Sequence, residues 1–199
     1  MTETDVQIVL YEGFDELDAV GPFEVFANAA RYGADLTVSL VTLEPRETVT
    51  ASHGLRVGVD GVLDDPDLLV VPGGGWNDRS SAGAWSEVER GDLPEAAARA
   101  HEEGATVASV CTGGMILAHG GVLDGRPAVT HHGALDDLRE FDVEVREDRV
   151  VDDDDVVTAG GVTSGIDLAL HLVERLVDRE TAERIATEME FEIRNDRRV

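Results

Sequence analysis

The segment Ala105-Thr-Val-Ala-Ser-Val-Cys111-Thr-Gly-Gly-Met-Ile-Leu-Ala118 contains the only cysteine of the chain. A short apolar, β-branched run ends on Cys111, small residues follow at once, and a helix-like apolar run comes next. This order predicts a buried strand, a tight turn that carries a nucleophile, and a helix N-terminus. Small neighbours permit the strained backbone of such a turn, and a helix N-terminus favours thiolate over thiol. A cysteine that only packs in the core is the alternative that this segment leaves open.

The composition indicates one globular domain over residues 1–199. Of the 199 residues, 42% are hydrophobic, which suits a single core. No apolar run approaches the roughly 18 to 20 residues that cross a bilayer, and the acidic N-terminus is unlike a secretory signal. A single cysteine excludes an internal disulfide and fits a reducing compartment. We therefore expect a cytoplasmic protein without a membrane partner.

The charge balance is strongly acidic. Forty-two acidic residues oppose 16 basic ones, every basic residue is an arginine, and the formal net charge is −26. Salt screens the resulting self-repulsion, so this composition predicts an acidic surface adapted to a high-salt, halophilic cytoplasm. Binding of a cationic partner is the alternative. Because no basic patch is present to neutralise phosphates, we expect no nucleic acid partner.

Strand-like and helix-like segments alternate along the chain. Strands separated by helices predict a mostly parallel sheet with helices on both faces, an α/β fold. The predicted strands are Val6–Tyr11, Leu36–Leu43, Leu68–Val71, Thr106–Val110, Ala128–Thr130 and two or three within 142–158, with a hairpin over Thr48–Val59 around His53. The predicted helices are one from Leu17 towards Gly33, and 79–90, 93–103, Ala134–Arg139, Val162–Leu176 and Thr181–Glu190.

Glycines and titratable side chains follow the ends of five predicted strands, the place where α/β folds bind ligands. They are Asp18, Gly73–Gly75, Cys111, His131 with His132, and the segment Gly160–Gly165. The glycine run exposes backbone N–H groups that an oxyanion hole requires. Each feature also has a structural explanation: an acid favours a helix start, histidines pack or face solvent, and glycines permit close helix–sheet packing. Since Pro22 cannot donate to the Asp18 carbonyl, we expect the helix to start or kink there and leave Asp18 on the rim.

Together these motifs resemble the ThiJ/PfpI superfamily, which has the class I glutamine-amidotransferase-like fold. The resemblance covers residues 5 to 190 and is carried by 13–22, Val71–Gly74, Val110–Gly113, Ala128–His131 and Val157–Asp167. It implies a flavodoxin-like three-layer α/β/α sandwich that is usually a homodimer. Within the site it implies Cys111 as a nucleophile in a nucleophile elbow, Asp18 as its acidic neighbour, and backbone N–H groups of Gly74 and Thr112 as an anion pocket. The resemblance implies no cofactor and no metal.

Three residues distinguish branches of this superfamily. Thr112 follows the cysteine where proteolytic relatives carry histidine, and Asp18 stands where glyoxalase-like and deglycase-like members usually carry glutamate. Both favour the isonitrile-hydratase-like branch, and so a small-molecule substrate: an isonitrile hydrated to an N-substituted formamide. His132 departs from the branch, in which an aromatic residue often follows the histidine.

Two other functions stay open. The first is glutathione-independent glyoxalase or deglycase activity, with His131 or His132 as a proton carrier. The second is a non-enzymatic sensor related to the sensing domains of some transcription regulators.

Two further expectations concern ionisable groups. The opposing effects of a helix N-terminus and a carboxylate predict that Cys111 and Asp18 share a proton. We expect a thiolate below neutral pH, a raised Asp18 pKa, and ready oxidation of Cys111 to a sulfinic acid. The acidic tract Asp152–Asp155 lacks the glycine and glutamate of a calcium loop, which predicts a solvated turn.

Overall fold

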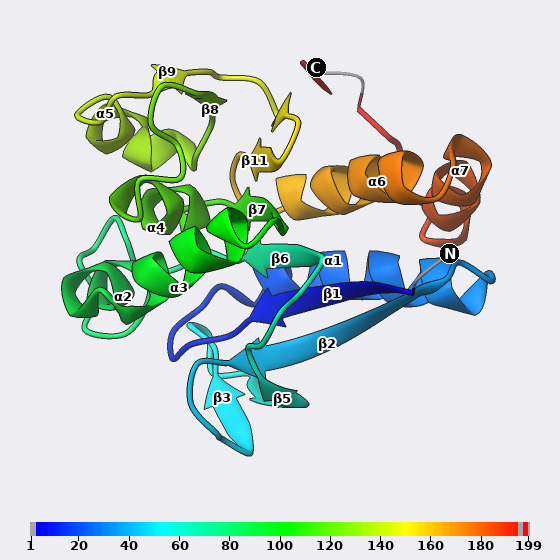
Figure 1. The fold of residues 1–199 in the computed structure, drawn as a ribbon, viewed down its shortest axis with the longest axis horizontal. Helices are drawn as coiled ribbons and strands as arrows, with labels where there is room; N and C mark the ends of the chain where they lie inside the picture. Colours follow the sequence, from blue (N-terminus) through cyan, green and yellow to red (C-terminus); the bar gives the residue numbers. More distant parts are fainter. Residues whose placement is uncertain (1–2, 195–196, 199) are drawn as a thin grey trace.

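An eight-stranded sheet forms the centre of the computed structural model, which describes residues 3–194 and 197–198 (Figure 1). Its spatial order is β12-β10-β11-β7-β6-β1-β2-β5. The strands are β1 (Thr4–Val9), β2 (Leu36–Thr42), β5 (Gly61–Val62), β6 (Leu68–Val71), β7 (Thr106–Val110), β10 (Val150–Asp153), β11 (Val156–Ala159) and β12 (Arg197–Arg198).

The sheet is mostly parallel, as predicted. From β5 to β11 every neighbouring pair is parallel, and only β10 runs antiparallel to β11. The central strands are apolar runs because both faces of the sheet are covered; all four residues of β6 are buried. The chain goes from β1 to β2 on one side and returns to β6 on the other. This reversal places a topological switch point, where ligands bind, at the carboxyl ends of β1 and β6.

Helices form a layer on each face of the sheet. Helices α1 (Glu16–Arg31), α6 (Ser164–Leu176) and α7 (Arg179–Glu188) pack together on one face (Figure 1). Helices α2 (Ala84–Arg90), α3 (Asp92–Glu102) and α4 (Gly113–His119) pack together on the other. The predicted three-layer α/β/α sandwich is therefore confirmed.

Two small sheets and a helical turn lie outside these layers. Strands β3 (Thr48–Thr50) and β4 (Arg56–Gly58) form the hairpin predicted around His53. Strand β8 (Pro127–Ala128) pairs with β9 (Glu144–Val145), and a 3-10 turn (His132–Ala134) leads into the short helix α5 (Leu135–Leu138).

The start of α1 corrects one prediction. The helix begins at Glu16, with Asp15 as its N-cap accepting from the Leu17 N–H at 3.2 Å, and continues through Pro22. Asp18 lies in the first turn with its side chain fully buried, so it is not on the rim. Packing explains why proline is tolerated, since Pro22 is buried and lies 3.3 Å from where a Cβ on Gly165 of α6 would be.

The acidic tract also differs from the prediction. Asp152 and Asp153 belong to β10, so only Asp154 and Asp155 form the turn, and the Asp152 side chain is 6% exposed and bonded to His171 and Arg175. Asp155 pairs with Arg126 and His101. The turn is thus held by contacts with two arginines and two histidines that lie elsewhere in the fold.

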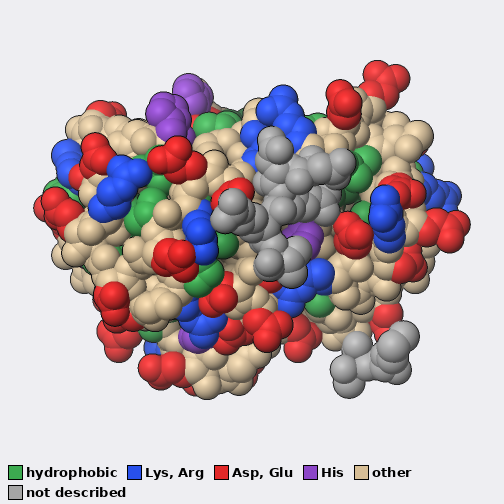
Figure 2. Space-filling view, turned by 90° about the horizontal axis from the view of Figure 1, so that it is seen from above, with side chains coloured by type: hydrophobic (Ala, Val, Ile, Leu, Met, Phe, Trp, Pro, Cys, Tyr) green, Lys and Arg blue, Asp and Glu red, His purple; other side chains and the backbone are tan. Residues whose placement is uncertain are grey.

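The surface shown in Figure 2 carries acidic side chains over its whole breadth, with arginines among them. Within the part of the chain that the structure describes, no helix combines the length and the apolar character needed to span a membrane.

Candidate active site

Cys111 lies in a sharp turn between β7 and α4. Its φ is 56°, a left-handed conformation that is unusual for a residue with a side chain. Two hydrogen bonds fix its N–H, to the carbonyls of Ala159 at 3.1 Å and Gly160 at 2.9 Å. The Thr130 hydroxyl donates to its carbonyl at 2.8 Å. The strand–turn–helix geometry expected from the sequence is therefore present, and the strain is held by the end of β11.

Glycine is required where β6 and this turn meet. A Cβ on Gly113 would lie 2.1 Å from the Val71 carbonyl oxygen, and one on Gly73 would lie 2.4 Å from the Thr112 nitrogen. Both clashes would be with backbone atoms, which are held by the end of β6 on one side and by the turn before α4 on the other. The small residues of the motif thus permit close approach of two backbones beside Cys111.

Asp18 faces the same region from α1. Its Oδ2 accepts from the Gly73 N–H at 3.0 Å. Its Oδ1 is buried, and no N–H or O–H group among the described residues donates to it. Burial, followed by the charge of Asp15, raises the pKa of Asp18 well above its ordinary value. The Gly73 N–H and the Cys111 thiol counteract part of this rise in pKa. The predicted raised pKa of this carboxyl is confirmed in direction.

The thiol differs from the prediction. Cys111 is 6% exposed, and burial together with the Asp18 charge raises its pKa to about 12. The N–H groups of Val162 and Thr112 lower this pKa but do not outweigh burial. The expected thiolate below neutral pH is therefore wrong for the resting protein, because α4 has only two turns and the sulfur is hardly hydrated.

The predicted anion pocket is only partly formed by the expected groups. The Gly74 N–H is already bonded, to Thr112 Oγ1 at 2.9 Å. The Thr112 N–H faces the sulfur, and the second N–H that does so belongs to Val162, which has a φ of 39°. Sequence analysis missed Val162, since nothing in the pattern Gly160-Gly-Val-Thr distinguishes which amide faces Cys111. The positive φ of a β-branched residue is the structural sign of its special position.

The two histidines have different positions. His131 is half-buried, its Nδ1 accepts from the Gly133 N–H at 3.1 Å, and it lies 3.3 Å from Asn77 Nδ2. A Cβ on Gly161 would lie 2.6 Å from its ring, so that glycine makes room for the imidazole. His132 is exposed and stacks on His131 with ring centroids 4.1 Å apart. Of these two histidines, His131 lines the cavity described next and His132 does not.

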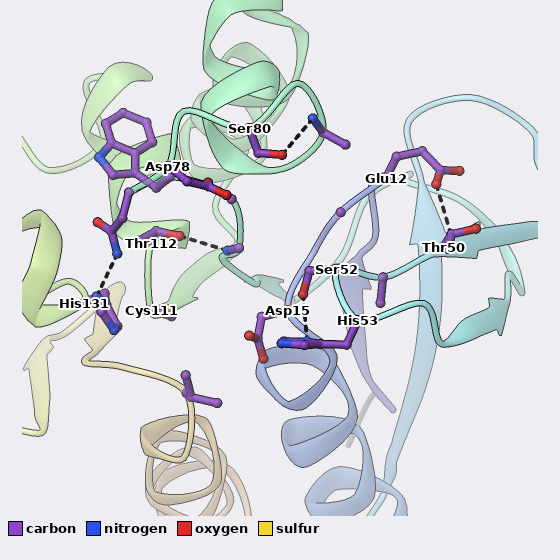
Figure 3. Close-up of a pocket in the computed structure, with 18 residues that line it drawn as sticks. Glu12, Asp15, Thr50, Ser52, His53, Asp78, Ser80, Cys111, Thr112 and His131 are labelled. Carbon is purple, nitrogen blue, oxygen red and sulfur yellow. Dashed lines mark hydrogen bonds between the residues drawn. The ribbon is translucent and has the colours of Figure 1, made fainter.

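A cavity of about 610 Å³ opens above Cys111 (Figure 3). Cys111, Thr112 and His131 lie on one side of it, and the residues contributed by the β1–α1 loop and the β3–β4 hairpin lie on the other. Val162 also lines it. The loop after β6 forms a further wall with Gly74, Gly75 and the segment 76–82. This volume suits a small molecule.

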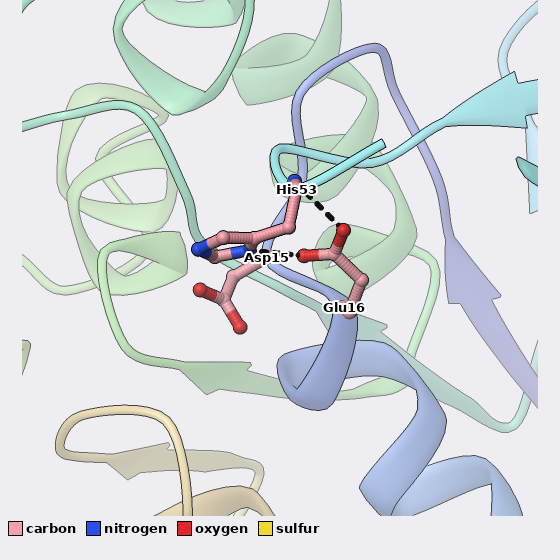
Figure 4. Close-up of side chains that lie close together, drawn as sticks. All are labelled: Asp15, Glu16 and His53. Atoms are coloured by element: carbon pink, nitrogen blue, oxygen red, sulfur yellow. Dashed lines mark hydrogen bonds and ion pairs between the residues drawn. The ribbon is translucent and has the colours of Figure 1, made fainter. Parts of the chain in front are cut away.

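A second cluster at the cavity was not predicted (Figure 4). Atoms of Asp15, Glu16 and His53 that could bind a cation lie within 4.8 Å of one another, the one such group among the described residues. Hydrogen bonds already use these atoms: Glu16 Oε2 is 2.7 Å from His53 Nδ1, and Glu16 Oε1 accepts from the His53 N–H at 2.7 Å. The positive end of the α1 dipole also disfavours a cation here. We therefore describe the group as a hydrogen-bonded cluster. The sequence predicted the hairpin but gave no sign of where it docks.

Comparison with known proteins shows the family of this chain. Residues 4–175 match the DJ-1/PfpI family, and the chain belongs to it. An isonitrile hydratase from Pseudomonas putida is 32% identical over 191 residues, 94% of this chain and 78% of that protein. A deglycase from Pyrococcus horikoshii is 35% identical over 123 residues, 57% of this chain and 68% of that protein. The crystal structure of a ThiJ/PfpI family protein from Pseudomonas syringae matches with a TM-score of 0.85 and 27% identity, covering 96% of this chain and 76% of that one.

Proposed function

We propose that this chain is a cysteine-dependent enzyme that hydrates isonitriles to N-substituted formamides. The observation that carries the proposal is the pairing of the Cys111 thiol, held at a φ of 56°, with the fully buried carboxyl of Asp18. The Cys111 thiol lowers the pKa of Asp18 by a side-chain hydrogen bond, which supports proton transfer between the two groups. The similarity to an isonitrile hydratase supports the choice of substrate.

The first step forms a bond between sulfur and the terminal carbon of the isonitrile. Asp18 takes the thiol proton as sulfur attacks and delivers it to that carbon, which gives a thioimidate, Cys–S–CH=N–R. A base is needed here because the pKa of the resting thiol is raised to about 12. The N–H groups of Thr112 and Val162 stabilise negative charge on sulfur during the attack.

The second step adds water. Asp18, again a carboxylate, accepts a proton from the water that attacks the imidate carbon. As the carbonyl forms, the remaining hydrogen of the added hydroxyl moves to nitrogen, the carbon–sulfur bond breaks, Asp18 returns its proton to sulfur, and the formamide leaves. The balance is one isonitrile plus one water to one formamide, with the enzyme unchanged.

The carbonyl chemistry of a deglycase or glyoxalase is the second candidate. The observation that favours it is His131 in the wall of the cavity, with burial lowering the pKa of its imidazole. A neutral imidazole near Cys111 suits proton transfer between the carbons of an α-oxoaldehyde.

Parallel assays test the proposal. Purified protein in multimolar salt is expected to convert a simple isonitrile to its formamide, measured by chromatography, and to leave methylglyoxal unchanged. Cys111→Ser and Asp18→Asn should each abolish turnover. The control Asp136→Asn alters a side chain that is 97% exposed and should retain it. Lactate formation without formamide would favour the second candidate, and no turnover of either compound would favour a sensor.

A further inference from the structure

The hairpin β3–β4 brings a second proton-transfer group to the cavity of Cys111. His53 lies at the hairpin's turn and lines the cavity, opposite Cys111 and His131 (Figure 3). The proposed mechanism leaves this side chain unused. Its imidazole is 77% exposed, so it can exchange protons with bulk solvent directly, whereas Asp18 is fully buried.

Glu16 holds the imidazole in one orientation. Its carboxylate receives hydrogen bonds from the His53 N–H at 2.7 Å, from the Ser52 hydroxyl at 3.1 Å and from the Leu55 N–H at 3.4 Å. The remaining contact joins Glu16 Oε2 to His53 Nδ1 at 2.7 Å. A carboxylate only accepts, so Nδ1 carries a hydrogen and Nε2 is the nitrogen available for catalysis. Figure 4 shows the other ring nitrogen pointing away from Glu16.

The charges around His53 favour its protonated form. Glu16, by hydrogen bond and by charge, and then Asp15 raise the pKa of His53. The same hydrogen bonds lower the pKa of Glu16 to about 2 despite its burial, so it stays ionised. The other titratable side chains that line the cavity are Glu12, Asp78, Cys111 and His131. Of these, Glu12 and Asp78 are acids.

We propose that His53, oriented by Glu16, is the general acid that protonates the nitrogen of the thioimidate while Asp18 activates the attacking water. This inference rests on the proposed function. A carboxylate that orients an imidazole, which in turn acts on a reacting group, follows the logic of a catalytic triad. In this chain the Glu16–His53 pair acts in the second step, on the imidate nitrogen, and Asp18 exchanges a proton with the sulfur of Cys111.

The proton balance closes with both groups. His53 Nε2–H gives its proton to the imidate nitrogen, water adds to the carbon, and Asp18 takes one proton from that water. When the carbon–sulfur bond breaks, sulfur recovers the proton from Asp18. The hydroxyl group of the intermediate becomes the formamide carbonyl and returns its proton to His53.

A covalent intermediate provides the main test. With wild-type protein and cyclohexyl isonitrile, intact mass spectrometry is expected to show free enzyme and formamide product. In His53→Gln, kcat is expected to fall about 10²-fold while the first step stays intact. The thioimidate on Cys111 should therefore accumulate, and the protein mass should increase by that of one isonitrile. Far-UV circular dichroism and thermal unfolding check that the variant is folded.

The pH profile provides a test that a structural role would not meet. A general acid must be protonated, so the kcat of the wild type should decrease as pH rises through the raised pKa of His53. Glu16→Gln removes the largest cause of that rise, and the decrease should move to lower pH. His101→Gln is the matched control, because His101 also bonds a carboxylate at 2.7 Å, that of Asp155, but lies outside the cavity.

The outcomes separate the two proposals. No adduct and no formamide with wild-type protein would contradict the proposed function itself. Normal turnover in His53→Gln, loss of adduct formation in that variant, or an unmoved pH profile in Glu16→Gln would each overturn the role of His53 and leave the Cys111 chemistry standing.

Discussion

At the scale of single residues, the site depends on one proton shared between two buried groups. Burial disfavours the charged form of both Cys111 and Asp18, and each negative charge would disfavour the other. The raised thiol pKa keeps Cys111 protonated at rest, and in the proposed mechanism sulfur gives up its proton to Asp18 only when substrate is present. Such a resting state protects the only cysteine of the chain from indiscriminate reaction.

Alkylation of Cys111 tests this view of the pair. Iodoacetamide labelling of the wild type should be slow at neutral pH and still rising at the highest accessible pH, since the pKa is about 12. Asp18→Asn removes the carboxylate charge, so the thiol pKa should fall. The rate of labelling at pH 8 should increase about tenfold for each unit by which that pKa falls. Mass spectrometry of the labelled peptide measures both rates. A wild-type profile with an apparent pKa of about 8.5, the value for a free cysteine, would contradict the description of a buried thiol.

Sequence alone identified the residues that carry a recognisable local pattern. Cys111 and Asp18 follow strand ends, and their proximity follows from the parallel sheet. The pKa of the thiol could not be predicted, because it depends on burial by elements distant in the chain. Val162 and His53 were missed for the same reason: their roles arise from backbone strain and from the docking of a hairpin on α1.

At the scale of elements, the site depends on how closely the loop after β6 approaches the start of α4. Gly73→Ala would place a Cβ 2.4 Å from the Thr112 nitrogen. We expect a loss of about 1–3 kcal/mol in stability, the usual cost of overpacking, and loss of turnover because the Asp18 and Thr112 contacts shift. Thermal unfolding and the isonitrile assay measure these effects. Gly58→Ala, where nothing lies within 4 Å, is the control and should change neither.

The same loop is held to α5 by Asp137. Its Oδ2 accepts from Trp76 Nε1 at 2.6 Å and from Arg79 at 3.1 Å, and Trp76 lines the cavity. Asp137→Ala leaves a buried indole N–H without its partner, at a cost of about 1–3 kcal/mol. We expect a higher KM with a smaller change in kcat, since the wall moves but Cys111 does not. The neighbouring Asp136→Ala is the control, and an equal effect of both variants would contradict the role of Asp137.

The elements themselves were largely predictable because hydrophobic periodicity decides them. Buried strands such as β6 are short apolar runs, and α6 shows a regular apolar face. The exception is α1, where a local rule about Pro22 predicted a break. Tertiary packing of the Gly21-Pro22 segment against α6 outweighs the missing hydrogen bond, and sequence gives no measure of that packing.

At the scale of the whole molecule, we expect the charge of −26 to make the stability of the fold depend on salt. Acidic side chains are spread over the surface in Figure 2, so their repulsion acts on the compact state as a whole. The screening length falls from about 10 Å at 0.1 M salt to about 3 Å at 1 M. The melting temperature should therefore rise as sodium chloride is increased over this range.

A variant with fewer acids separates screening from other effects of salt. Asp65→Asn, Glu102→Gln and Glu103→Gln neutralise three exposed side chains that make none of the ion pairs found among the described residues. Less repulsion remains to be screened, so the variant should melt higher than wild type in dilute salt and depend less on sodium chloride. For a chain of this size each kcal/mol of relieved repulsion raises the melting temperature by about 2–4 °C. Sucrose, which stabilises by exclusion from the surface, should affect both proteins equally. If the variant and wild type respond identically to salt, the acidic surface is not what makes the fold depend on it.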